Sequence, residues 1–513
     1  MQKKHKILIL VLLTVFVFIG SVCGVFLVKP AMELKKLKEL KLKDSSTAEY
    51  LGKMPETDEI YSWIKDLTDM GARKPGTEAG KKAQEYMVEK FTSFGLDNID
   101  VVKSDATLWT CDEWGLTVSG AEIPSYYMTH TLNDGAFGKF STPDGGLKTE
   151  IVYVGEGSES DFKNVDVQGK IVVSDVVFSD IPVGLAKFVS YLYYDPENTL
   201  PLTSSRANPY SPNTYPYNYY RAMENGAAGF VGILSNYIDS NEFNNEDYSY
   251  LGGKMKIPAL WVSRTEGANI IEVIKTAGDA AEASLKMSVQ IEEVKAGAVV
   301  GYLPGKSEDI IMIQSHYDSS TTGAVEDASG SSVVLALAKF YAQIPKEERD
   351  RSLLFVAMDT HFADYVSHDA FIEKYLTKGH KILADVCIEH IANEVKEVDG
   401  EVVFTGEIEP RIIFASEIDA LLDITKEEIV RHGLQRTIIL PTDMLGDELP
   451  TDADPYFQIG VPIISLVSAP IYLYDNIDTI DKVSKEELRP TTEAFADIVW
   501  RLTQLPKEDF SKN

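Results

Sequence analysis

Three side chains that can bind a divalent metal follow one apolar segment of the chain closely. His316 and Asp318 come directly after residues 310–313, a short apolar run typical of a buried strand, and Asp327 stands eleven residues after the histidine. Residues 329–342 carry valine and leucine at helical spacing and are predicted to form the next helix. Ligands in open α/β sheets bind just beyond the carboxyl ends of strands. The spacing therefore indicates a candidate metal site at the end of this strand.

The residues between the histidine and the helix are more specific than the His-x-Asp pattern, which is common by itself. The run from 316 to 330, which ends in Glu326-Asp327-Ala328-Ser329-Gly330, resembles the co-catalytic zinc aminopeptidase family. Bacterial leucyl aminopeptidases, glutamate carboxypeptidase and the transferrin receptor belong to that family. The resemblance implies that His316 binds one zinc ion, that Asp318 supports this histidine, and that Asp327 bridges two zinc ions. It also implies an α/β fold with a mixed, mostly parallel central sheet and helices on both faces.

The family carries two adjacent glutamates after its next strand, and this chain lacks both. Residues 353–358 are the corresponding apolar run. The register then places His361 where the family has its general base and Phe362 where it has a zinc ligand. A phenylalanine cannot bind a metal. His361, with an ordinary pKa of about 6.5, could be a replacement base, a replacement ligand, or only a polar residue at the mouth of an inactive site.

Of the family's last two ligands, this chain keeps one and lacks the other. Residues 384–388 are predicted to form a third strand, and Glu389 follows it at the position of a carboxylate ligand. The family's final histidine stands four residues before an Asp-Thr pair. Here Asp478-Thr479 is present, but Tyr474 occupies that position. No histidine follows His432 in the sequence, so no other alignment recovers the missing ligand.

The missing residues all belong to one of the family's two metal positions. By resemblance, His316, Asp327 and Glu389 serve one zinc ion, whereas Phe362 and Tyr474 replace the two private ligands of the other. Three protein ligands with an open fourth position are sufficient for a catalytic zinc ion. The expected cofactor is therefore one zinc ion, and a site that holds none is the open alternative.

Two functions of different classes are compatible with such a site. The first is a zinc-dependent exopeptidase of the aminopeptidase type, which would use a single metal, His361 as the general base and Asp318 beside the histidine ligand. The second is a non-catalytic domain that binds a peptide or protein ligand, a role that the transferrin receptor illustrates within the family. The missing base and ligands favour reduced or lost hydrolysis.

The resemblance also divides the chain into segments. Residues 51–120 and 297–505 are similar to one peptidase-like domain that an insertion interrupts. The insertion, residues 121–296, has alternating strand and helix signals and resembles the protease-associated domain, an α/β module. Within it, residues 191–220 are rich in tyrosine and proline. This segment is either a loop packed on the body or a lip that contacts a peptide or glycan, because tyrosine offers a large contact area at low entropic cost.

The N-terminus carries a second clear signal. Ile7 to Val28 contains no charged residue and is long enough to span a bilayer. We predict a transmembrane anchor over residues 1–29, followed by a basic stalk over residues 30–50, with the body outside the cytoplasm of the cell. A cleaved signal peptide is the alternative. The lysines that follow the apolar run would favour a cytoplasmic body by the positive-inside rule, but long domains translocate largely regardless of charge.

Composition restricts the partners of the body. Residues 1–43 carry a net charge of +7 within a total of −30, which leaves −37 on residues 44–513. Such an acidic body excludes nucleic acid bound through a basic groove, so we expect no nucleic-acid partner. The three cysteines, Cys23, Cys111 and Cys387, do not make a disulfide framework, and the sequence does not decide whether the last two pair.

Overall fold

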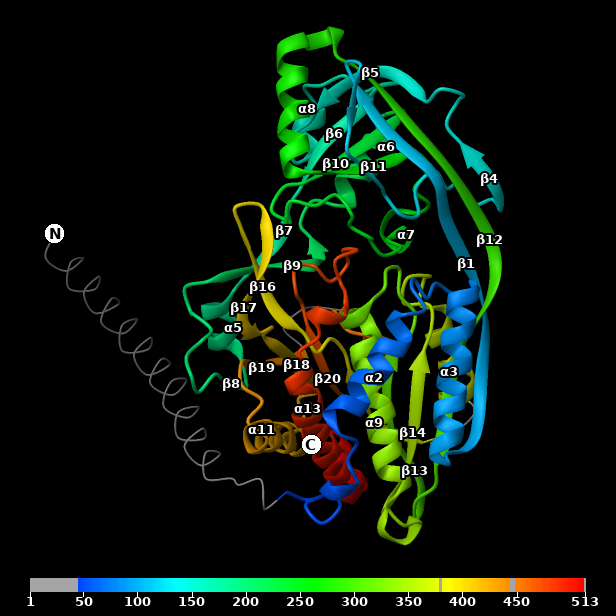
Figure 1. The fold of residues 1–513 in the computed structure, drawn as a ribbon, viewed down its shortest axis with the longest axis vertical. Helices are drawn as coiled ribbons and strands as arrows, with labels where there is room; N and C mark the ends of the chain where they lie inside the picture. Colours follow the sequence, from blue (N-terminus) through cyan, green and yellow to red (C-terminus); the bar gives the residue numbers. More distant parts are fainter. Residues whose placement is uncertain (1–44, 378–380, 443–447, 512–513) are drawn as a thin grey trace, which may run out of the picture.

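The computed structural model describes residues 45–377, 381–442 and 448–511 (Figure 1). In these three ranges no helix is both long and apolar enough to cross a membrane. The anchor predicted for residues 1–29 and most of the stalk predicted for residues 30–50 lie outside the described residues. Both therefore stay predictions.

One large mixed sheet runs through the molecule, and its lower half in Figure 1 carries the predicted site. The strands of this half are β12 (Glu282–Leu303), β13 (Ser307–His316), β14 (Arg351–Met358), β15 (Ile382–Ile388), β18 (Arg411–Ala415), β19 (Thr437–Pro441) and β20 (Ile463–Ser468). Parallel pairing joins β14, β13, β15 and β20 in that order, and it also joins β18 to β19. The pairs β12–β14 and β18–β20 are antiparallel. The predicted mixed central sheet is confirmed.

Helices cover both faces of this half because its strands are apolar on both sides. The helices are α2 (Thr57–Thr68), α3 (Glu78–Phe94), α9 (Gly330–Ala342), α10 (Val366–Phe371), α11 (Asp419–Arg431), α12 (Asp454–Gln458) and α13 (Lys485–Gln504). Side chains alternate across a strand. Ile311 and Ile313 of β13 thus pack in the core that includes α9 and α13, while Met312 packs on the other face with Phe371 of α10 and Tyr456 of α12.

The insertion forms the upper half in Figure 1. Its elements are β3 (Tyr126–Tyr127), β4 (Gly138–Ser141), β5 (Leu147–Tyr153), α4 (Glu159–Phe162), β6 (Ile171–Val176), α6 (Tyr217–Glu224), β10 (Gly229–Leu234), α7 (Ser249–Gly252), β11 (Ala259–Ser263) and α8 (Arg264–Ala277). Strands β5, β6, β10 and β11 pair in parallel. Strands and a helix thus lie where the sequence predicts them, but whether this unit is a protease-associated domain stays a prediction.

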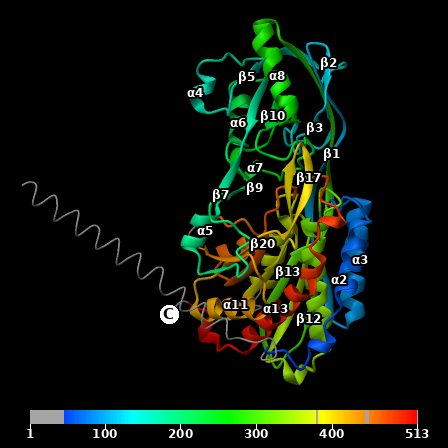
Figure 2. The ribbon, with the colours of Figure 1, turned by 60° about the vertical axis from the view of Figure 1, so that its left-hand side comes forward.

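Two connections hold the halves together. Strands β1 (Asp97–Val118) and β12 are long and pair along most of their length, from the lower half into the upper (Figures 1 and 2). The second connection is residues 178–212, which we call the strap. It contains β7 (Phe178–Pro182), α5 (Val183–Val189), β8 (Leu192–Tyr194) and β9 (Ser205–Pro212). Strand β8 pairs with β19, so the strap adds an edge strand to the lower sheet.

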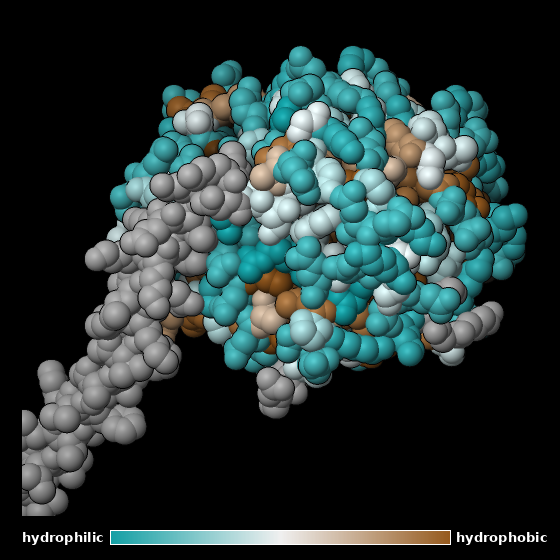
Figure 3. Space-filling view, turned by 90° about the horizontal axis from the view of Figure 1, so that it is seen from below, coloured by the Kyte–Doolittle hydropathy of each residue, from teal (hydrophilic) through white to brown (hydrophobic). Residues whose placement is uncertain are grey.

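Three further features are a short edge strand, a separate hairpin and the state of the cysteines. Strand β2 (Ala121–Ile123) pairs with β1, and β16 (Asn393–Val398) with β17 (Glu401–Ile408) forms a separate hairpin. The face seen from below is mainly hydrophilic (Figure 3), as expected for a chain with a net charge of −30. Cys111 and Cys387 are both free thiols, which answers the question that the sequence leaves open.

Candidate metal centre

Strand ends bring the candidate ligands together. His316 is the last residue of β13, His361 follows β14, and His390 follows β15. Glu326 lies in the helical turn Ala324–Ser329 that leads into α9. The parallel strands β14, β13 and β15 are neighbours, so their carboxyl ends meet at one edge of the sheet.

The centre of the site is the carboxylate of Glu326. Its Oε1 lies 3.4 Å from His316 Nε2 and 3.5 Å from His361 Nε2, and its Oε2 lies 2.5 Å from His390 Nε2. The rings of His316 and His361 are nearly parallel, with centroids 4.3 Å apart. One ligand atom from each of His316, Glu326 and His361 lies within 4.8 Å of the other two, and all three residues are buried.

Each histidine is held through its other ring nitrogen. His316 Nδ1 lies 3.0 Å from the carbonyl oxygen of Asp318, and His390 Nδ1 lies 2.9 Å from that of Ser468. His361 Nδ1 lies 2.9 Å from Asp452 Oδ1. Carbonyl and carboxylate oxygens only accept hydrogen bonds, so each Nδ1 carries a proton, and each Nε2 faces Glu326. A histidine that donates to an acceptor and offers its second nitrogen is the usual arrangement of a metal ligand.

The facing atoms have no other use in the structure. Among the described residues, the Nε2 atoms of His316, His361 and His390 and both carboxylate oxygens of Glu326 are buried without a hydrogen bond. Leaving buried polar atoms unsatisfied costs about 1–3 kcal/mol each. A cation bound between these atoms would satisfy them, and two imidazoles with one carboxylate are a ligand set that zinc accepts. The residues present therefore fit a zinc ion.

The charges of the buried side chains also favour a bound cation at the centre. Burial alone would lower the pKa of His316, but Asp452 and the contacts with Asp318 and Glu326 raise it well above its usual value. The pKa of His390 is likewise lowered by burial but raised by Glu326, to about 9. Burial would raise the pKa of Glu326, yet His390 and His316 hold it well below its usual range. The site thus attracts positive charge, as protons on the rings or as a metal ion.

Asp327 faces away from this centre, in contrast to the bridging role that the sequence implies for it. Its Oδ1 accepts hydrogen bonds from the backbone nitrogens of Gly330, at 3.0 Å, and His390, at 3.2 Å. Its Oδ2 accepts a hydrogen bond from the Ser315 hydroxyl. The backbone at both Glu326 and Asp327 is non-helical, and this turn directs the two adjacent carboxylates to different sides. Glu326 occupies the place expected for Asp327, which instead anchors the start of α9.

Glu389 and Asp318 lie beside the centre rather than in it. Glu389 Oε1 accepts hydrogen bonds from the Thr451 hydroxyl, at 2.7 Å, and from the Asp452 backbone nitrogen, at 3.2 Å. Burial and the nearby Asp452 raise the pKa of Glu389 to about 7. Asp318 Oδ1 lies 3.3 Å from His316 Nδ1 without a hydrogen bond, and the backbone carbonyl of Asp318 is the group bonded to that nitrogen.

The second metal position of the resemblance is filled by other groups. Phe362 and Tyr474 are both buried, and their rings meet edge to face with centroids 5.8 Å apart. The Tyr474 hydroxyl donates a hydrogen bond to Glu246. The second oxygen of Glu326 faces His390 Nε2, 2.5 Å away. Among the described residues, His316, Glu326 and His361 are the one group of three converging ligands at this site.

The insertion contributes two residues that sequence reasoning did not identify as part of the site. The Tyr210 hydroxyl donates to the Ser468 carbonyl, at 2.5 Å, and lies 2.8 Å from His390 Nδ1. Glu246 Oε1 lies 3.6 Å from His361 Nε2. Tyr210 belongs to the tyrosine-rich segment for which a lip was one of two predictions. No sequence signal pointed to Glu246.

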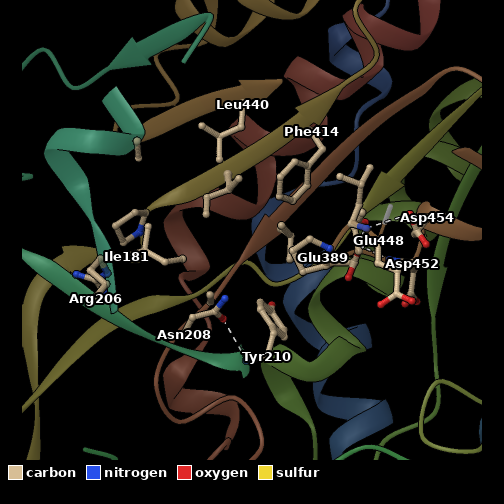
Figure 4. A pocket seen from close by; sticks show the side chains of 18 of the residues that line it. Ile181, Arg206, Asn208, Tyr210, Glu389, Phe414, Leu440, Glu448, Asp452 and Asp454 are labelled. Atoms are coloured by element: carbon tan, nitrogen blue, oxygen red, sulfur yellow. Dashed lines mark hydrogen bonds between the residues drawn. The ribbon is translucent and has the colours of Figure 1, made fainter. Parts of the chain in front are cut away.

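A cavity of about 850 Å³ opens beside the centre (Figure 4). His361, Glu389, Asp452, Tyr210 and Glu246 line its inner end. Its other walls come from the strap and from β18 and β19. The candidate metal centre is thus buried but reaches an open space through His361.

Comparison with known proteins agrees with this architecture. Residues 298–499 match the model of peptidase family M28. The curated aminopeptidase YwaD of Bacillus subtilis is 22% identical over 318 residues, which are 60% of this chain and 57% of YwaD. The chain therefore aligns with little more than half of that relative's length.

Two solved structures share the fold. A peptidase M28 precursor from Shewanella amazonensis superposes with a TM-score of 0.63 and 19% identity, covering 91% of this chain and 95% of that one. The zinc aminopeptidase BSAP from Bacillus subtilis gives a TM-score of 0.59 and 17% identity, covering 89% and 98%. The likeness therefore extends over both halves of the molecule.

Proposed function

We propose that this chain, which matches peptidase family M28 over residues 298–499, holds a single zinc ion on His316, Glu326 and His361 and uses it to bind peptides, with hydrolysis weak or absent. The observation that carries the proposal is the convergence of three buried ligand atoms that lack other partners. Phe362 and Tyr474 argue against a second ion, because the phenylalanine has no ligand atom and the tyrosine hydroxyl donates to Glu246.

Each residue then has a defined part. Zinc held there would supply a Lewis acid for the carbonyl oxygen of a bound peptide. The Asp318 carbonyl and the Asp452 carboxylate hold protons on Nδ1 of His316 and His361, which would leave both Nε2 atoms for the ion. Glu389 offers a carboxylate at the inner end of the cavity, where it could receive the amino end of a peptide.

A general base for hydrolysis is missing from its expected place. His361 is poorly placed for that role, because its Nδ1 faces Asp452, at 2.9 Å, and its Nε2 faces Glu326, at 3.5 Å. Loss of a general base typically costs a factor of about 10² to 10⁴ in rate. This supports weak hydrolysis rather than efficient turnover.

The test compares zinc content and hydrolysis in matched variants of the full chain. We expect one zinc ion per wild-type chain by mass spectrometry of the metal, and loss of that ion in Glu326→Gln and in His361→Ala. Asp327→Asn, which changes the neighbouring carboxylate, should keep the ion. Two ions per wild-type chain, or retention in Glu326→Gln with loss in Asp327→Asn, would contradict the proposed ligand set.

A second candidate function rests on Glu246. Its carboxylate lines the cavity and lies 3.6 Å from His361 Nε2, so it could replace the missing base from the side of the insertion. In that case the wild type would hydrolyse aminoacyl substrates, and Glu246→Gln would lower kcat by about 10² or more while keeping zinc. Glu242→Gln, on the same loop but outside the cavity lining, is the matched control.

A further inference from the structure

The cavity beside the metal centre lies between the strap and the edge of the lower sheet. Strand β8 of the strap pairs with β19, with Tyr193 opposite Ile438. Helix α5 then packs over the sheet, and Val183 and Ala186 of α5 belong to the same apolar cluster as Phe414 of β18. The insertion and the peptidase-like domain thus build this cavity jointly.

One part of the cavity is a trough of aliphatic and aromatic side chains. The strap supplies Val183, Ala186 and Leu200, and the sheet supplies Phe414, Ile438 and Leu440. All six side chains are buried. A cavity of about 150 Å³ already accommodates benzene, whereas this one measures about 850 Å³. The space is larger than one amino-acid side chain needs and is typical of a site for a larger organic ligand.

The inner end of the cavity has the opposite character. Figure 4 shows Glu448, Asp452 and Asp454 together on one side of the cavity, away from Leu440, with Glu389 nearer to Phe414. Over the whole cavity, nine of the described lining residues are aspartate or glutamate, and His361 is paired with one of them, Asp452. The one arginine among the described lining residues, Arg206, is neutralised by Glu394 and Glu409. Charge complementarity therefore favours a ligand whose polar end is cationic.

We propose that the cavity binds amphiphilic amines: molecules with a free amino group at the acidic inner end and an apolar part, larger than one amino-acid side chain, in the trough. The inference rests on the proposed function, whose substrate class it names, because the amine would lie beside the candidate metal centre. Among peptides, it predicts a free N-terminus followed by an extended apolar group, such as a lipid-like chain or adjacent large apolar residues.

The first experiment measures binding of n-butylamine and n-octylamine to the full chain in lipid nanodiscs, with empty nanodiscs as the reference. Each buried methylene contributes about 0.8 kcal/mol, or about fourfold in Kd. The two amines differ by four methylenes, so we expect octylamine to bind about 200-fold more tightly than butylamine. Octanoate, with a similar chain but a negative charge, should bind at least tenfold more weakly than octylamine. Equal binding of the two amines, or octanoate binding as tightly as octylamine, would overturn the proposal.

A pair of variants locates the apolar part in the trough. Ala186→Phe places a ring in the trough and should weaken octylamine at least tenfold while leaving butylamine unchanged. Phe188→Ala, on the same helix but outside the cavity lining, should bind both amines as the wild type does. Unchanged octylamine affinity in a folded Ala186→Phe variant would contradict the assignment. If that variant does not fold, the chain-length series on the wild type still decides.

Measurements with and without zinc separate this inference from the proposed function. If no zinc binds but octylamine still binds more tightly than butylamine, the proposed metal site is contradicted and the proposed amine-binding cavity is supported. If one zinc ion binds but octylamine has no advantage over butylamine, the metal site stands and the trough proposal fails.

Discussion

At the scale of single residues, the second nitrogen of each histidine determines what the site can do. His361 Nδ1 donates to Asp452 Oδ1 over 2.9 Å, which fixes the ring and its tautomer. Burial would raise the pKa of Asp452, but His361 and His316 hold it well below its usual range, so this carboxylate is ionised. A carboxylate behind a histidine ligand raises the basicity of the ligand and limits its rotation.

Asp452→Asn should therefore weaken zinc binding although Asp452 is not itself a proposed ligand. Loss of such a supporting carboxylate typically costs a factor of about 10 to 100 in metal affinity. Competition of the full chain with a chromophoric zinc chelator would measure the change. Asp454→Asn, which alters a cavity-lining carboxylate that does not contact His361, is the control, and an equal loss in both variants would contradict the supporting role.

A second residue-scale prediction concerns pH. Burial raises the pKa of Asp385 well above its usual value, and Gln314 Nε2, which donates to it over 2.8 Å, opposes this only in part. The folded chain thus keeps a proton there that the unfolded chain loses above about pH 3.9. Stability must then fall as pH rises from that value toward the folded pKa, by about 1.4 kcal/mol per pH unit from this residue alone.

Asp385→Asn removes this proton, so the variant should lose less thermal stability than the wild type between pH 5 and pH 8. The measurement is the melting temperature of zinc-free protein at both pH values. Asp105→Asn removes an exposed carboxylate and should keep the wild-type pH dependence. If the melting temperature of the Asp385→Asn variant falls as steeply as that of the wild type, Asp385 is ionised in the fold and the prediction is wrong.

At the scale of elements, the close approach of α9 to β15 positions the metal centre. Gly330 begins α9, and a Cβ atom there would lie 2.2 Å from the Ile388 carbonyl oxygen and 2.5 Å from Asp327 Oδ2. Real Cβ atoms do not approach backbone this closely. Helix α9 can begin four residues after Glu326, in close contact with the end of β15, only because Gly330 has no side chain.

Gly330→Ala should consequently move α9 away from β15 and disturb the site. Overpacking of this kind costs about 1–3 kcal/mol, so we expect a lower melting temperature and weaker zinc binding together. Gly115→Ala in β1 introduces a methyl group with no atom within 4 Å and should change neither. Loss of melting temperature without any change in zinc affinity would separate helix packing from the site.

At the scale of the whole molecule, charge and length divide the chain into an apolar, basic start and an acidic body. The net charge is +7 over residues 1–43 and −37 over the rest of a chain whose total is −30. We propose that Ile7–Val28 anchors the protein as a single-pass membrane protein and that the body lies outside the cytoplasm. The uncharged run supports this, and the described residues neither add to it nor oppose it.

Protease added to intact cells should therefore degrade the body, while a cytoplasmic marker protein stays whole. Lysis should be needed only for the marker. A body that survives until lysis would place it in the cytoplasm, as the lysines after the apolar run would favour by the positive-inside rule.

The sequence by itself predicted the elements of the peptidase-like half and the positions that carry its chemistry. A continuous apolar run ends in polar residues where a buried parallel strand meets a loop. This pattern predicts β13, β14 and β15 and, directly after them, the polar residues His316, His361 and Glu389. The replacements at 362 and 474 could also be predicted, because Phe362 follows a recognisable strand and Tyr474 stands four residues before the Asp478-Thr479 pair.

Only the tertiary structure decided which groups meet. Two adjacent acidic residues are equivalent in a sequence, and the backbone of one turn directs Glu326 to the histidines and Asp327 to α9. The sequence likewise does not show which of the adjacent residues Glu389 and His390 faces the centre, and the structure places His390 there. Tyr210 and Glu246 reach the site from the insertion, more than a hundred residues away in the chain from the His361 and His390 that they contact. Periodicity along the chain records which face of an element is buried, but it carries no information on what a distant segment brings to that face.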